Sequence, residues 1–291
     1  MHAEHLRYLP ARCVDRVKRR ERVLKHHADP AAADRPSLRR TQSEQIPRLE
    51  DRLAAVVTDA MDRPAEKVKP WYEYRRIFLT EKRIEAGVAF WDTHRELLER
   101  ISAQSGVPPE IIVGILGVET FYGRITGSYR VLDALATIAF EYPKRSAFFT
   151  RELEEFLLLS REQNIDPLSA TGSYAGAMGS PQFISSSYRA YAADGDGDGR
   201  VDLWNSWPDI FASVANYFTA HRWQPGERVV TRADGAMPAA ALSAGPRLDR
   251  TLGELTAAGV EFDRSGATGE KAMLFELEQE NGPEYWVGFQ N

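Results

Sequence analysis

Glu119 is the residue of this chain whose surroundings most strongly suggest chemistry, because it ends an otherwise apolar segment that begins after two prolines. Pro109 suits the first turn of a helix, where the missing backbone N–H would have no partner anyway. In that helix Glu119 shares one face with Ile112, Ile115 and Leu116. We therefore expect the carboxyl group on the buried side, where burial raises its pKa toward the range of a general acid. A structural interpretation stays open, since such a residue can also pair with an arginine or cap a turn.

A second pattern predicts a calcium site. Asp194, Asp196 and Asp198 alternate with glycines, and the same spacing places the backbone carbonyl of Arg200 at the seventh position of an EF-hand-like loop. The glutamate usual at the twelfth position is missing, and Asp209 could supply that carboxylate from a longer loop. An acidic surface turn without an ion is the alternative. So many carboxylates repel one another without a cation, which favours a structural calcium ion.

The composition is typical of a soluble globular protein. The chain has 291 residues, of which 43% are hydrophobic and 27% charged, with a formal net charge of −5. This balance gives no basic field of the kind that binds nucleic acid. The single cysteine, Cys13, excludes an internal disulfide. The sequence shows no apolar run long enough to span a membrane, no lipidation site and no apolar signal core. We therefore expect either a cytoplasmic protein or a chain from which the signal is missing.

Four regions follow from composition and periodicity. Residues 1–45 are expected to be a disordered basic leader and linker, and 46–105 to be a helical domain. Residues 106–223 should form the main core with its acidic loop, and 224–291 a small β-containing domain. The chain is therefore predicted to be α+β and mostly α.

Several element boundaries can be predicted from caps and breakers. Thr80 can cap a helix that stops at Gly106, where prolines follow. A Gly-rich loop is expected over 171–181, and a short strand over Arg228–Thr231. The turn 280–282 separates two alternating segments and predicts a hairpin. Further helices are expected over Val131–Phe140, 146–163 and Pro208–His221.

Four segments together resemble the membrane-bound lytic murein transglycosylase B family. They are 117–124 (GVETFYGR), 132–137 (LDALAT), 172–183 (GSYAGAMGSPQF) and 213–218 (SVANYF). The aromatic segment Trp71–Phe78 and the C-terminal hairpin are also similar to this family. The resemblance runs from about residue 64 to the end. It implies a lysozyme-like core with an added helical domain and a small β domain, and a closing core helix beyond the last residue of this chain.

The resemblance also implies site residues. Glu119 falls on the single catalytic acid/base, and Ser173 on the residue that hydrogen-bonds this carboxyl and the sugar N-acetyl group. Gln182, Tyr217 and Tyr74 fall on the substrate groove.

Two further sites are implied by the same resemblance. Lys144 and Arg145 occupy a substrate-binding pair that is often Arg-Arg in the family, and lysine cannot make the planar bidentate contact of arginine. The acidic loop matches a calcium-binding loop of the family, with Asp209 as its late carboxylate.

The implied activity is non-hydrolytic cleavage of the β-1,4 bond between N-acetylmuramic acid and N-acetylglucosamine, which leaves 1,6-anhydromuramoyl ends. A glycosidase normally uses two carboxylates, whereas no second acid in this chain has a comparably apolar setting. Peptidoglycan strands are the expected partner of a monomeric periplasmic protein that associates peripherally with the outer membrane or the wall-synthesis machinery. A hydrolytic muramidase and an inactive, calcium-stabilised wall-binding remnant remain alternatives.

Overall fold

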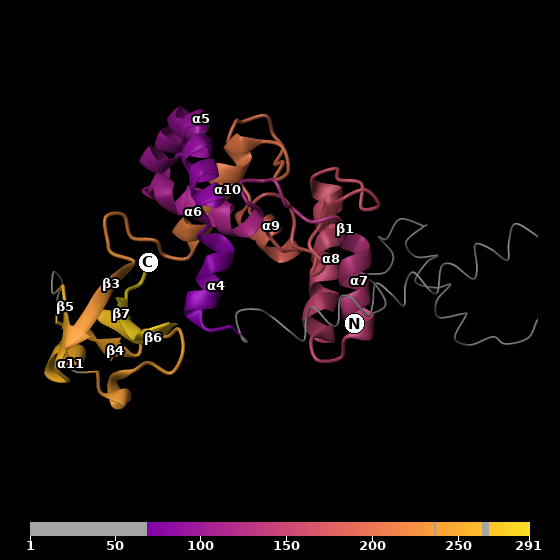
Figure 1. Cartoon of the computed structure of the whole chain (residues 1–291). Helices are drawn as coiled ribbons and strands as arrows, with labels where there is room; N and C mark the ends of the chain where they lie inside the picture. The colour runs from indigo at the N-terminus through magenta and orange to yellow at the C-terminus, as the bar shows by residue number, and fades with distance from the viewer. Residues whose placement is uncertain (1–68, 236, 264–267) are drawn as a thin grey trace, which may run out of the picture. The chain divides into compact units, whose positions relative to one another are not determined.

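The computed structural model describes residues 69–235, 237–263 and 268–291, and these form a helical part followed by a small β-sheet (Figure 1). The leader 1–45 and the helical periodicity expected from residue 46 to Arg63 lie outside the described residues. The helices are α4 (Trp71–Phe78), α5 (Glu81–Ser105), α6 (Pro109–Thr120), α7 (Val131–Glu141), α8 (Ser146–Glu162), α9 (Ser185–Tyr191), α10 (Trp207–Ala220) and α11 (Leu252–Ala257). The mostly helical α+β class is confirmed.

Helix α5 begins and ends where its caps predict. The side chain of Thr80 accepts a hydrogen bond from the backbone N–H of Arg83 at the start, and Gly106 ends the helix in the left-handed conformation. Pro109 occupies the first turn of α6, and this helix packs against α5. No single described helix is both long and apolar enough to cross a membrane; α5 and α6 meet that criterion only jointly, across a bend of 115°.

Helices α7 and α8 pack side by side as a hairpin, with the turn at Tyr142–Arg145 between them (Figure 1). Their facing sides are apolar and fully buried, including Leu135, Ile138 and Phe156. Glu152 of α8 is also buried, and its carboxylate accepts hydrogen bonds from the backbone N–H and the hydroxyl of Ser186 at the start of α9. This carboxylate therefore serves as a cap for α9.

The Gly-rich loop folds tightly between β1 (Tyr129–Arg130) and α9. It begins with β2 (Thr171–Gly172), which pairs antiparallel with β1. Met178 then forms isolated bridges to both Gly172 and Phe183. A side chain at residue 172 would put its Cβ 2.2 Å from the carbonyl oxygen of Ala177, so only glycine fits this fold of the chain.

The C-terminal part is a five-stranded sheet in the order β4-β6-β7-β3-β5 with α11 packed on it. The predicted hairpin is present, with seven residue pairs between β6 and β7. The expected strand at Arg228–Thr231 begins later, because β3 pairs with β7 only from Val230 onward and continues to pair with β5. The strands are β3 (Val230–Gly235), β4 (Arg250–Thr251), β5 (Val260–Phe262), β6 (Lys271–Gln279) and β7 (Gly282–Gly288).

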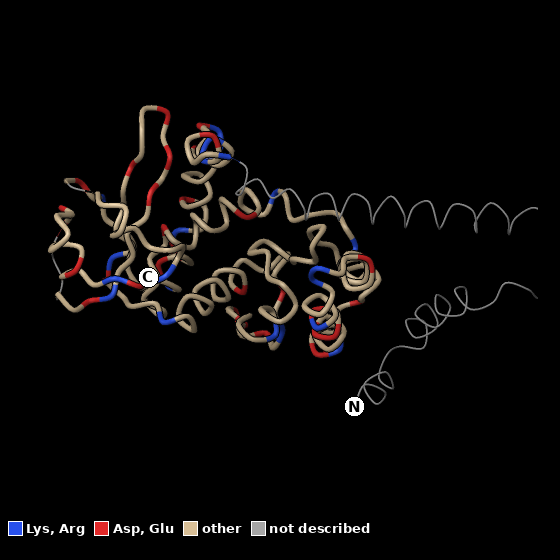
Figure 2. The backbone as a smooth tube through the Cα atoms, turned by 90° about the horizontal axis from the view of Figure 1, so that it is seen from below, with Lys and Arg blue, Asp and Glu red and all other residues tan. Residues whose placement is uncertain are grey.

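Acidic residues follow one another along the β6–β7 hairpin (Figure 2). On β6, Ala272 and Leu274 are buried, whereas Glu276 and Glu278, which continue the same alternation, are exposed. The outer half of the hairpin therefore extends beyond the buried core of the sheet. At its tip, Glu280 forms an ion pair with Arg76 of α4.

Candidate active site

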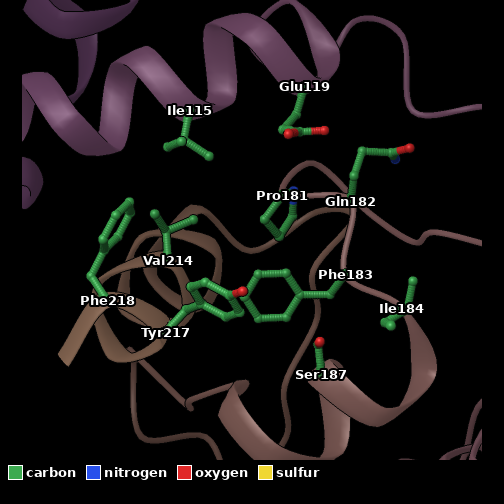
Figure 3. A pocket seen from close by; sticks show the side chains of 10 residues that line it. All are labelled: Ile115, Glu119, Pro181, Gln182, Phe183, Ile184, Ser187, Val214, Tyr217 and Phe218. Atoms are coloured by element: carbon green, nitrogen blue, oxygen red, sulfur yellow. The ribbon is translucent and has the colours of Figure 1, made fainter. Parts of the chain in front are cut away.

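A pocket of about 240 Å³ opens between the C-terminal end of α6, the end of the Gly-rich loop and helix α10 (Figure 3). Part of its apolar wall comes from two residues of α10 that the sequence interpretation did not single out. Val214 and Phe218 lie one turn apart on α10, a spacing that could have revealed them. The pocket is lined by Ile115, Glu119, Pro181, Gln182, Phe183, Ile184, Ser187, Val214, Tyr217 and Phe218.

Glu119 projects from the last turn of α6 toward this pocket (Figure 3). Ile112 and Leu116 are fully buried, but Glu119 is exposed at the pocket mouth, so the expectation of a carboxylate on the buried side is wrong in this respect. Atoms packed around the carboxyl nevertheless displace much of its water. This burial raises the pKa of Glu119 above its ordinary value of 4.5. Among the described residues, none forms a hydrogen bond or ion pair with this carboxylate.

Two of the predicted groove residues line the same pocket. Gln182 donates hydrogen bonds from its amide nitrogen to the carbonyl oxygens of Thr126 (3.1 Å) and Gly179 (2.9 Å). Both amide protons are thereby used, and its amide oxygen is left as the atom that can accept a hydrogen bond. The backbone of Gln182 is left-handed, with φ 53°, a conformation that costs free energy for a residue other than glycine. The two hydrogen bonds hold the side chain in place despite this cost.

Tyr217 belongs to a cluster of rings on α9 and α10. Its ring lies 5.7 Å from that of Phe183 across the pocket wall, and 5.2 Å from that of Tyr191 in an edge-on arrangement. The ring of His221, the residue directly after α10, stacks on it at 4.1 Å with an interplanar angle of 25°. These contacts fix the orientation of Tyr217 on both sides.

The other predicted site residues do not line the pocket. The Oγ of Ser173 accepts hydrogen bonds from the backbone N–H groups of Ala175 (3.2 Å) and Ala177 (3.0 Å), which leaves its O–H able to donate. Arg145 lies over the ring of Phe148 at 4.9 Å, in the turn before α8. Lys144 lies 5.7 Å from the ring of Tyr142, and Tyr74 packs between Trp71 and Phe78 on α4.

The acidic loop brings three of its predicted ligands together. One carboxylate oxygen each of Asp194, Asp196 and Asp209 lies within 4.8 Å of the others, and Asp209 is only 2% exposed. Asp198 and Arg200 are outside this group of three. Three convergent oxygen ligands suit a hard cation such as calcium, so the side chains present fit the predicted ion.

Backbone hydrogen bonds hold these carboxylates in position. Asp209 accepts from the N–H of Gly195 (2.8 Å) and of Asp202 (2.8 Å), and so joins the two ends of the loop to the first turn of α10. Asp194 accepts from three backbone N–H groups, that of Gly199 at 2.8 Å among them, and these bonds lower the pKa of its carboxyl. These backbone hydrogen bonds therefore orient both carboxylates before any ion binds.

Comparison with known proteins agrees with this geometry. Residues 17–291 match the model of the transglycosylase SLT domain. The chain is 42% identical over 265 residues to membrane-bound lytic murein transglycosylase B of Escherichia coli K12, which covers 89% of this chain and 72% of that protein. The soluble lytic transglycosylase SltB1 of Pseudomonas aeruginosa is 51% identical, with a TM-score of 0.76 over 81% of this chain and 79% of its own.

Two related structures contain ligands. The Escherichia coli lytic transglycosylase Slt35 was solved in complex with calcium; it is 43% identical, with a TM-score of 0.73 over 81% of this chain and 74% of its own. SltB3 of Pseudomonas aeruginosa, 30% identical with a TM-score of 0.65 over 77% of this chain and 60% of its own, was solved with NAG-anhNAM-pentapeptide. The domain match, the sequence identity and the shared fold agree with the acid at the mouth of the pocket: this chain belongs to the MltB/SltB family of peptidoglycan lytic transglycosylases.

Proposed function

We propose that this enzyme cleaves the β-1,4 bond between N-acetylmuramic acid and N-acetylglucosamine without water, and that Glu119 is its only acid and base. One observation carries the proposal: among the described residues that line the pocket, Glu119 is the sole carboxylic acid. Hydrolytic glycosidases place a second carboxylate across the bond, as nucleophile or as the base that activates water. With one carboxyl group, the substrate itself has to supply the nucleophile.

A single residue can then carry out both proton transfers of the reaction. Protonated Glu119 gives its proton to the glycosidic oxygen as the bond to the anomeric carbon of the muramoyl unit breaks. The resulting carboxylate takes the proton of the muramoyl 6-hydroxyl while that oxygen bonds to the same carbon. The carbonyl of the N-acetyl group can stabilise the positive charge between the two steps. Glu119 ends protonated, as it began, and no water is consumed.

The raised pKa of Glu119 suits this cycle, because the resting enzyme needs the protonated acid at a pH above the ordinary carboxyl value. The apolar walls formed by Ile115 and Phe183 supply that environment. The free amide oxygen of Gln182 can accept a bond from a sugar hydroxyl, and the ring of Tyr217 can lie against a sugar face. Gln182 lies beside Glu119, and Tyr217 lies across the pocket from it (Figure 3).

The remaining residues are proposed to act beyond the pocket, along a longer glycan strand. The O–H of Ser173 would donate to the N-acetyl group or to the Glu119 carboxylate once substrate is bound. Lys144 and Arg145 carry positive charge to the turn before α8, where the carboxylates of a wall peptide could bind. Tyr74 offers an aromatic face on α4 for a further sugar.

Asp194, Asp196 and Asp209 are proposed to hold a calcium ion, with Asp198 and the Arg200 carbonyl as further ligands. The ion would neutralise the charge of the loop and hold it against α10. Its role is structural. The calcium complex of Slt35 supports this choice of ion.

The proposed partner is the peptidoglycan glycan strand, consistent with the muropeptide bound by SltB3. Periplasmic location, peripheral association with the outer membrane or the wall-synthesis machinery, a monomeric state and lack of nucleic-acid binding are proposed on the family relationship. We also propose that the chain divides into a helical domain at 46–105, the catalytic core at 106–223 and a small β-containing domain at 224–291.

Mass spectrometry of muropeptides after digestion of purified peptidoglycan tests the reaction. We expect muramoyl ends lighter by one water than the reducing ends that a hydrolytic muramidase leaves. The Glu119→Gln variant keeps the size of the side chain and removes the proton, so it should release no fragments. Reducing ends would establish a muramidase, and undiminished release by Glu119→Gln would show that Glu119 is not the acid.

A further inference from the structure

Arg83, near the start of α5, contacts the backbone of α6 beside Glu119. Its guanidinium donates a hydrogen bond to the carbonyl oxygen of Gly117, and the same nitrogen lies 3.5 Å from the carbonyl oxygen of Val118. The Val118 carbonyl belongs to the peptide group that joins this residue to Glu119. Arg83 thus contacts the peptide from which the catalytic side chain projects.

The end of α6 needs such a partner. The last carbonyls of a helix have no intrahelical donor and carry partial negative charge. Here the chain turns away abruptly, because Phe121 and Tyr122 both adopt left-handed conformations, with φ 52° and 59°. The N–H of Tyr122 bonds back to Leu116, so it is not available to the carbonyl of Val118. The guanidinium takes the place of the missing next turn.

Arg83 is itself held from several directions. Its guanidinium carbon lies 4.7 Å from the ring centre of Phe121 and 5.6 Å from that of Phe78. The hydroxyl of Tyr122 donates a hydrogen bond of 3.1 Å to the backbone carbonyl oxygen of Arg83. Arg83 is half-buried, which limits the screening of its charge by water. The arginine therefore links α4, α5 and the turn after α6.

We propose that Arg83 is a positioning residue: by binding the carbonyls of the last turn of α6, it keeps the carboxyl group of Glu119 directed into the pocket. This inference rests on the proposed function of Glu119. Arg83 touches neither the pocket nor the substrate path described above, so it acts only through the helix end. Without it, the last turn would fray and Glu119 would move toward water.

The test compares Arg83→Gln and Arg83→Lys with Arg95→Gln in the full chain. Arg95 lies on the same helix but is exposed and pairs with Asp92. For Arg83→Gln we expect kcat on purified peptidoglycan to fall about tenfold to a hundredfold, the size of a loss from misplacing a catalytic group by about 1 Å. KM should stay within about twofold. Lysine can still donate to the carbonyls but has no planar group to stack on the rings, so the kcat of Arg83→Lys should lie between those of Arg83→Gln and the parent. The kcat of Arg95→Gln should match that of the parent.

The pH profile of kcat separates positioning from the alternatives. Burial raises the pKa of Glu119, so a carboxyl that moves into water should lose its proton earlier, and the alkaline limb of Arg83→Gln should shift to lower pH. A shift to higher pH would mean that Arg83 acts as a nearby charge. An unmoved limb with a lowered melting temperature would mean that it only supports the fold. Either result overturns the proposal.

The Glu119→Gln variant distinguishes a failure of the proposed function from a failure of the positioning role. If Glu119→Gln stays active, the proposed function fails, whatever Arg83 does. If Glu119→Gln is inactive while Arg83→Gln keeps the parental kcat and pH profile, the proposed function stands and only the positioning role is wrong.

Discussion

The backbone N–H of Ser180 donates a hydrogen bond of 2.8 Å to the carbonyl oxygen of Leu203. This bond joins the Gly-rich loop to the acidic loop. The indole N–H of Trp204 adds a second link, to the carbonyl oxygen of Thr171 at 3.0 Å. Gly179 has no room for a side chain, since a Cβ there would lie 2.3 Å from the same Leu203 oxygen. The loop that leads to Gln182 is thus supported by the loop that carries the proposed calcium ligands.

We predict that a calcium chelator lowers the melting temperature of the enzyme. Asp194, Asp196 and Asp209 would repel one another without a cation, and the folded state would lose the free energy of ion binding. Differential scanning fluorimetry with and without added calcium measures this. The chelator should have little effect on Asp196→Asn, whereas Asp234→Asn, which changes an exposed residue of β3, should respond like the parent. Equal melting temperatures of the parent in both conditions would contradict a structural ion.

We predict that Glu119→Gln is more stable than the parent at neutral pH. The folded-state pKa of Glu119 is raised above its ordinary value of 4.5. The native state therefore holds the proton more tightly, and the stability contributed by this group is fully present below pH 4.5 and lost as pH rises through the raised value. Glutamine does not undergo this loss. Melting temperatures measured across the acidic and neutral range should show the advantage of the variant shrinking as pH falls; an advantage independent of pH would contradict the raised pKa.

Two glycines of α6 should respond to alanine in opposite directions. Nothing lies within 4 Å of a Cβ added at Gly114, so Gly114→Ala should stabilise the protein by about 0.5–1 kcal/mol through helix propensity. A Cβ at Gly117 would lie 2.8 Å from the hydroxyl of Tyr122 and force the ring to move. Gly117→Ala should therefore destabilise the protein and, because it displaces the turn after Glu119, lower kcat. Urea unfolding gives both free energies, and a stabilised Gly117→Ala would contradict the packing of Tyr122.

For Tyr217 we expect the ring, and not the hydroxyl, to matter. Tyr217→Phe keeps the contacts with Phe183 and His221 and should retain kcat/KM within about threefold. Tyr217→Ala removes an aromatic wall worth about 0.5–1.5 kcal/mol, so kcat/KM should fall by up to about tenfold, mainly through KM. Initial rates on soluble glycan fragments measure both variants. A loss in Tyr217→Phe as large as in Tyr217→Ala would assign the contact to the hydroxyl.

Local rules predicted the elements well where sequence neighbours decide the structure. The N-cap at Thr80, the left-handed Gly106 and the proline in the first turn of α6 all stand where caps and breakers indicate. Strand β3 begins later than the sequence predicts, because its limits are set by pairing with β5 and β7, which are distant in sequence.

The site shows the same division. Glu119 could be found from its apolar surroundings, but the pocket that it faces is also lined by Gln182 and Tyr217, which come from other parts of the chain. Arg83 could not have been found from the sequence. It stands in a charged stretch at the start of α5, and its contact with Gly117 exists only after α5 and α6 pack together.

The left-handed turn at Phe121 and Tyr122 limits how this enzyme can be made more heat-resistant. Replacing a left-handed residue by glycine usually relieves roughly 1–3 kcal/mol of strain. Glycine at Phe121 would remove the ring that packs against Arg83. Glycine at Tyr122 would remove the hydroxyl that packs between α5 and α6. Arg222 has the same backbone conformation, with φ 72°, on an exposed surface. Laboratory evolution toward higher working temperatures should therefore accept glycine at Arg222 and reject it at the turn after α6.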